Sequence, residues 1–153
     1  MRRYLVAVAA CLCVVISRGA FADDAQMNMA GHLHDMQADD SRVSLGLSAA
    51  MKQHQLTTMR GHLQAIKAIV GLMADGKFDE AAKIAHGRLG LTEEMKAMCT
   101  MPHNESFAAL GMAFHKSADE LGDILQTGNA NAALHALNKT MQYCVECHAT
   151  FRQ

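Results

Sequence analysis

Residues 56–73 read LTTMRGHLQAIKAIVGLM, and this stretch decides the fold. Its large apolar side chains recur at alternating spacings of three and four residues, which is the period of one face of an α-helix. The members of this stripe are Leu56, Met59, Leu63, Ile66, Val70 and Met73. A heptad-like stripe predicts a helix that packs nearly antiparallel against neighbouring helices in a bundle. Asp75-Gly76 follows it, with glycine in the position where helices commonly end.

Further helices are predicted toward the C-terminus. One runs from Phe78 to about Leu89, the next from the capping residue Asn104 to the break at Gly128-Asn129, and the last from about Asn131 to near the end. The absence of Trp, the single Pro and the abundant Ala, Leu and Met favour helix over strand. We therefore predict an all-α fold in which residues 44–153 form an antiparallel four-helix bundle.

The N-terminus has the layout of a secretory signal peptide. Arg2-Arg3 precedes an apolar run of 13 residues, and Ala20-Phe21-Ala22 forms a cleavage site. A run of this length is too short to span a bilayer, which needs about 20 residues, although an N-terminal membrane anchor is the alternative. The prediction is a cleaved segment 1–22, export to the periplasm and a flexible lead-in over residues 23–43. Methionines and histidines in that lead-in suit copper, but their spacing fits no fixed geometry.

The charge of the exported chain excludes some partners. Cleavage removes 3 of the 14 Lys and Arg residues and leaves 11 against 15 acids, a net charge of −4. Strong nucleic-acid binding needs a basic surface and is excluded. No later stretch is apolar for long enough to predict stable membrane insertion. The cysteines that remain are Cys99, Cys144 and Cys147, an odd number that argues against a framework of disulfides.

The most specific motif lies in the last predicted helix, where residues 143–148 read YCVECH. This is C-x-x-C-H, the attachment sequence of a covalent c-type haem. Residues three apart on a helix share a face, so Cys144 and Cys147 can bond two vinyl groups at one haem edge while His148 binds the iron. The alternatives are a redox-active cysteine pair and a zinc site of Cys99, His103, Cys144 and Cys147. Neither alternative accounts for the position of His148.

The ending CVECHATFR, residues 144–152, resembles that of the class II cytochromes c, the cytochrome c prime family. The resemblance covers about residues 51–152 and is strong only at this motif. It implies a four-helix bundle with one haem c, thioether bonds to Cys144 and Cys147, and His148 as proximal ligand. Arg152 resembles the family's basic residue beside the proximal pocket, which implies contact with a haem propionate. The alternative role for Arg152 is to complement the dipole at a helix C-terminus.

The group on the other face of the iron decides the function. In the family the first helix supplies this group, and the resemblance implies Met59 as the axial ligand, with His62 as the alternative. A thioether paired with His is an established set of haem ligands. Members that present an aliphatic side chain instead have five-coordinate iron. His54 and Met51 lie further along the same helix and are less favoured as ligands. Four histidines are expected at the surface or in polar contacts, and these are His86, His103, His115 and His135.

These expectations describe a periplasmic monohaem cytochrome that transfers single electrons between redox partner proteins, with homodimerisation left open. The sequence contains no nucleophile–base pair and no metal-hydrolase motif, so we do not expect an enzyme. A second hypothesis is a five-coordinate haem protein that binds nitric oxide or carbon monoxide. A third is a protein that binds a metal without haem.

Overall fold

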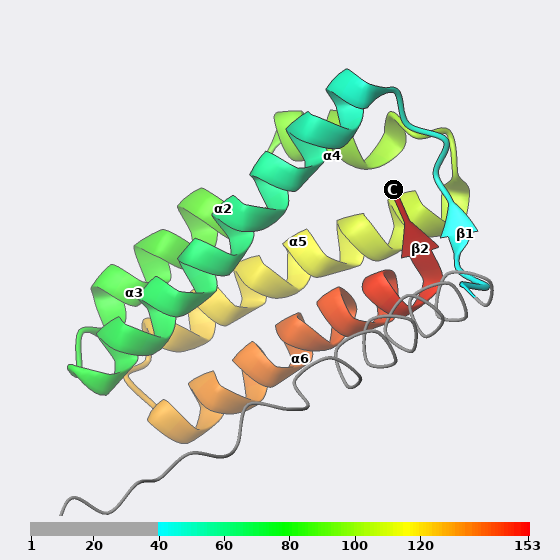
Figure 1. Cartoon of the computed structure of the whole chain (residues 1–153). Helices are drawn as coiled ribbons and strands as arrows, with labels where there is room; N and C mark the ends of the chain where they lie inside the picture. Colours follow the sequence, from blue (N-terminus) through cyan, green and yellow to red (C-terminus); the bar gives the residue numbers. More distant parts are fainter. Residues whose placement is uncertain (1–39) are drawn as a thin grey trace, which may run out of the picture. The chain divides into compact units, whose positions relative to one another are not determined.

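The computed structural model describes residues 40–153, so the predicted signal peptide and nearly all of the lead-in lie outside the described residues. The described part is almost entirely helical, which confirms the all-α class (Figure 1). Its helices are α2 (Ala49–Ala74), α3 (Phe78–Ile84), the π-helical turn η1 (Ala85–Leu89), α4 (Glu93–Thr100), α5 (Glu105–Leu125) and α6 (Ala130–Thr150). None of the helices in this range is both long and apolar enough to cross a membrane.

Four of the helices begin at a residue whose side chain accepts a hydrogen bond from a backbone N–H three positions later. Ser48, Thr92, Asn104 and Asn129 fill this role for α2, α4, α5 and α6. The predicted cap at Asn104 and the predicted break at Gly128-Asn129 are thus confirmed. Gly76 has φ +72°, a left-handed conformation that glycine adopts without steric cost, and it ends the first helix as predicted.

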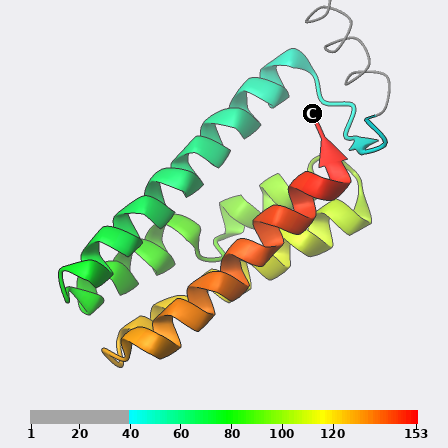
Figure 2. The same ribbon diagram turned by 60° about the horizontal axis from the view of Figure 1, so that its bottom comes forward.

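The core forms where α2, α3, η1, α5 and α6 meet. Helix α5 is central, because it packs against α6, α3, η1 and α4, whereas α2 packs on α3 and η1. Ile69, Leu89, Leu121 and Leu125 are fully buried there. Helices α2 and α6 make at most marginal contact with each other, and their ribbons are well separated in Figure 2.

The predicted burial of the apolar stripe on α2 is wrong for half of its members. Ile66 is buried, but Leu56, Leu63 and Val70 are 41%, 70% and 48% exposed. The reason is that α3 and η1 cover the side of α2 that carries Ala65 and Ile69. Val70 lies outside that contact, and Leu56 and Leu63 line an open cavity.

Helix α6 shows the same pattern. Leu134 and Met141 are exposed, because α6 packs on α5 mainly through residues that include Ala133, Leu137 and Thr140.

A two-residue parallel pair joins the two ends of the described chain. Strand β1 (Val43–Ser44) pairs with β2 (Phe151–Arg152), and the Leu45 N–H donates to the Arg152 carbonyl at 3.0 Å. The Arg42 guanidinium donates to the His148 carbonyl at 3.2 Å. These contacts hold the segment that follows the C-x-x-C-H motif. Strands this short have no readable period, so the sequence did not predict them.

Candidate functional site

A cavity of about 370 Å³ lies between α2, α4, α5 and α6. Its size falls within the range of small-molecule and cofactor sites. Helix α6 contributes Cys144, Cys147 and His148 to its wall, and α2 contributes Met59 and His62. The cavity thus brings together five of the six predicted site residues, from two helices that are far apart in the sequence. Most of the remaining lining side chains are aliphatic, aromatic or methionine; they include Leu56, Leu63, Ile66, Met95, Met98, Phe107, Leu110, Phe114 and Met141.

A second cavity of about 40 Å³ lies beside it, and Arg152, the sixth predicted residue, lines this one. The two cavities share five lining residues, Gln55, Met59, Phe107, Cys147 and His148. Met59 and His148 therefore line both cavities from two different helices. His62 lines only the larger cavity.

The two motif cysteines are half-buried free thiols in the cavity wall. Burial raises the pKa of Cys144, and burial together with Cys144 and Cys99 raises the pKa of Cys147. Both side chains are therefore protonated at neutral pH. Helix geometry places residues at i and i+3 on one face, so both thiols are available to a single occupant of the cavity.

The zinc alternative finds no support in the described range. His103 is exposed and does not line the cavity. Within residues 40–153, no group of three or more His, Cys, Asp or Glu residues is arranged to hold a metal ion. Cys99 is buried, at 6% exposure, and lines the cavity together with Met95 and Met98.

His62 is held as a neutral imidazole. Burial, and secondly the nearby His115, lowers its pKa to about 4. The ring centroids of His62 and Phe114 lie 5.1 Å apart, and Nε2 is buried with no hydrogen-bond partner. An atom that is fully buried does not face the open cavity. His62 would therefore have to rotate to present Nε2 to an occupant.

His115 also lines the cavity, although its sequence context did not predict a role at the site. It is 4% exposed, and its Nδ1 lies 2.6 Å from the Leu89 carbonyl. A carbonyl only accepts, so Nδ1 carries the proton and Nε2 a lone pair. Burial lowers the pKa of His115, opposed by the hydrogen bond to Leu89 and by Asp119. The sequence contained a sign of this burial, because His115 lies at helical spacing from Gly111 and Ala118 and so shares their face of α5.

Gln55 is a second residue that the sequence did not single out. It is 6% exposed, lines both cavities and makes no side-chain hydrogen bond to any residue from 40 to 153. Among residues 40–153, the fully buried side-chain atoms without a partner are His62 Nε2 and Gln153 Oε1, so the amide atoms of Gln55 are reached from the cavity that it lines. A polar group in such a position normally bonds to water or to a ligand. Nothing in the sequence distinguishes Gln55 from the exposed Gln53 and Gln64 on the same helix.

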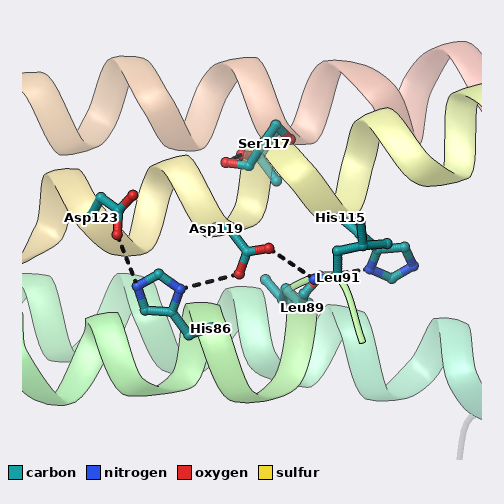
Figure 3. A network of polar contacts seen from close by, with 8 residues as sticks. His86, Leu89, Leu91, His115, Ser117, Asp119 and Asp123 are labelled. Carbon is teal, nitrogen blue, oxygen red and sulfur yellow. Dashed lines mark hydrogen bonds and ion pairs between the residues drawn. The ribbon is translucent and has the colours of Figure 1, made fainter. Parts of the chain in front are cut away.

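A polar network fixes η1 against α5 (Figure 3). His86 Nδ1 lies 3.1 Å from Asp119 Oδ1, and its Nε2 lies 3.4 Å from Asp123 Oδ1. Asp119 Oδ2 also accepts the Leu91 N–H at 3.0 Å. Gly122 lies directly under the His86 ring, where any side chain would clash. The network holds the segment that contains Leu89, the partner of His115, so its role is structural.

Comparison with protein-family models, with curated proteins and with solved structures gave no match for this chain. The function is therefore argued from the cavity and its lining residues.

Proposed function

We propose that this protein is a monohaem c-type cytochrome of the class II type, exported to the periplasm, that transfers single electrons between redox partner proteins. One observation carries the proposal. The C-x-x-C-H motif of α6 lines a largely apolar cavity whose opposite wall contains Met59 of α2. When bound, the haem iron supplies the one-electron chemistry. Cys144 and Cys147 would hold the haem covalently, and His148 would bind the iron.

The residues at the cavity fit such a group. The wall is largely apolar, as a porphyrin requires, and two thiols and an imidazole occur at the attachment spacing. The unpartnered amide of Gln55 supplies a polar group to the same space. Arg152 lines the adjoining cavity and is proposed to face a haem propionate. Its Nε already donates to the Arg42 carbonyl at 3.3 Å, so the strand pair orients this side chain.

The haem proposal also implies how the helices are arranged. We propose that α2, α3 with η1, α5 and α6 are the four helices of an antiparallel bundle. Helices α2 and α6 scarcely touch each other, yet both line the cavity. A haem between them would supply the packing that these helices do not give one another.

Met59 is the proposed sixth ligand, because it lines both cavities together with His148. His62 remains the alternative, although its buried Nε2 does not face the cavity. A thioether opposite an imidazole favours ferrous iron and raises the reduction potential. Burial among apolar side chains acts in the same direction. Leu56 and Leu63 line the same cavity from α2, so an aliphatic side chain opposite His148 would give the gas-binding alternative instead.

The test of attachment is haem staining of the denatured full-length protein. Wild-type protein should retain its haem, whereas Cys144→Ala combined with Cys147→Ala should lose it. Cys99→Ala is the matched control, because this third cysteine lines the same cavity. Undiminished staining of the double variant would refute the site. Absence of haem from wild-type protein would favour the non-haem alternative.

The test of the sixth ligand is the absorption spectrum of oxidised and reduced protein, with and without carbon monoxide. Wild-type protein should be low-spin and should resist carbon monoxide. Met59→Ala should turn the haem high-spin and speed ligand binding. His62→Ala should change little, and so should Met98→Ala, which removes another cavity methionine. A high-spin wild-type protein would favour the gas-binding function, and a high-spin state of His62→Ala alone would move the ligand to His62.

A further inference from the structure

Helix α2 carries an exposed stripe of alternating basic and apolar residues. Its members are Lys52, Leu56, Arg60, Leu63, Lys67 and Val70. The spacings are four, four, three, four and three residues, which keeps all six side chains on one side of the helix. All six are exposed, and Leu63 is 70% exposed. At 1.5 Å per residue the stripe extends for about 27 Å.

The charged residues of this stripe are all basic. Helix α2 contains no Asp or Glu from Ala49 to Ala74. Lys52, Arg60 and Lys67 form no ion pair with any residue that the structure describes. Elsewhere Lys139 pairs with Glu120, and Lys96 pairs with Glu93. Within residues 40–153, no acidic side chain therefore neutralises the stripe through an ion pair.

The stripe borders the candidate haem site. Leu56, Arg60 and Leu63 are exposed and also line the 370 Å³ cavity. Met141, which is 44% exposed, lines the cavity from α6 on the other side. The mouth of the cavity is thus flanked by apolar side chains, with cations along one edge. A partner seated on the stripe would therefore lie beside a group held in the cavity.

From this arrangement we propose that the α2 stripe is the docking surface for a redox partner protein whose contact face has an apolar centre surrounded by Asp and Glu. The inference rests on the proposed electron-transfer function. Electrostatic complementarity steers association and sets its rate, while the apolar side chains exclude water from the contact. Charges that steer the partner and a small apolar contact that holds it suit a short-lived complex in which the partner lies at the mouth of the cavity.

Two other occupants fit the charge less well. A second copy paired through α2 about a two-fold axis would bring the cations of both helices together, and neither helix offers an acid to compensate. An anionic membrane would attract the cations, but an interfacial helix needs a wide free apolar face. Here the other face of α2 is packed on α3 and η1. Only three large apolar side chains of the stripe are exposed, and two of them, Leu56 and Leu63, also line the cavity.

The first test follows electron transfer from the reduced, haem-loaded full chain to two small oxidants of opposite charge. At low ionic strength, Arg60→Glu with Lys67→Glu should slow oxidation by ferricyanide about tenfold and speed oxidation by a cationic cobalt tris-phenanthroline complex. The difference should collapse at about 0.5 M salt. Lys83→Glu with Lys116→Glu is the matched control on α3 and α5, and should change either rate less than about twofold. Equal effects of the two pairs would overturn the proposal.

The second test needs no haem chemistry. A labelled helical peptide with a heptad of Leu flanked by Glu should bind the full chain at low salt in a fluorescence anisotropy titration. The same peptide with Lys in place of Glu should not bind. Leu63→Ser should weaken binding at least about fivefold, whereas Leu134→Ser, which changes an exposed Leu on α6, should not. Equal binding of both peptides would overturn the proposal.

The remaining outcomes identify the other occupants. Sedimentation with phosphatidylglycerol vesicles that Leu63→Ser abolishes would assign the stripe to a membrane. A dimer in sedimentation velocity that the same substitution dissociates would assign it to a second copy. Either result overturns the proposal. If the purified chain carries no haem yet binds the acidic peptide, the cytochrome function is refuted and the basic docking surface stands. A haem protein that does not bind the peptide would keep the cytochrome function and overturn the docking surface.

Discussion

Loss of the proposed haem is expected to unfold the helical domain, and the volume of the cavity sets the magnitude of the destabilisation. Cavities left in protein cores cost about 24 cal/mol for each Å³. For a cavity of about 370 Å³ this gives roughly 9 kcal/mol. The figure is an upper bound, because the exposed mouth admits water. It is nevertheless comparable to the whole stability of a typical domain, about 5–15 kcal/mol. Helices α2 and α6 make at most marginal contact, so little direct packing would hold them together without the haem.

The assay compares haem-loaded wild-type protein with haem-free Cys144→Ala/Cys147→Ala protein, whose lack of haem is first verified by absorbance. The haem-free chain should keep far-UV helical signal but lose near-UV signal, side-chain NMR dispersion and a cooperative thermal transition. Cys99→Ala, loaded with haem, should retain all of these. A sharp melt and dispersed resonances in the haem-free chain would show that the helices pack without the haem and would refute the reasoning.

Three further predictions concern single features. Intact mass of exported protein should correspond to residues 23–153 plus one haem, and a retained N-terminus would refute the predicted cleavage after Ala22. Because the pKa of His62 is about 4 when folded and 6.5 ordinarily, the unfolded chain binds the proton more readily. Stability should therefore be complete above about pH 6.5 and should fall by up to about 3 kcal/mol toward pH 4. His62→Phe should remove that part of the slope in denaturant titrations, and an unchanged slope would argue against it. Gly111→Ala would place a Cβ 2.6 Å from the Cys99 sulfur, so it should destabilise by about 1–3 kcal/mol. Adding Cys99→Ala should recover much of that loss, and strictly additive effects would contradict the contact.

The sequence by itself determined the long helices α2, α5 and α6 and several of their ends, because those depend on residues within a turn of one another. It did not predict the π-helical turn η1 or a complete helix α4. The stripe of α2, the cap at Asn104 and the break at Gly128-Asn129 all act through contacts three or four residues apart. The C-x-x-C-H motif is local in the same sense. Its two thiols and imidazole lie within five consecutive residues, so their chemistry could be inferred without any fold.

Only the tertiary structure decided which side of each helix is covered. Leu56 and Ile66 belong to the same sequence stripe, but α3 and η1 bury one and leave the other exposed. The strand pair between Val43 and Phe151, and the arrival of Gln55 and His115 at the cavity, likewise depend on segments far apart in the chain. A periodic pattern predicts that a helix has an apolar face. The packing of all the helices together decides which neighbours bury that face and where a cavity remains.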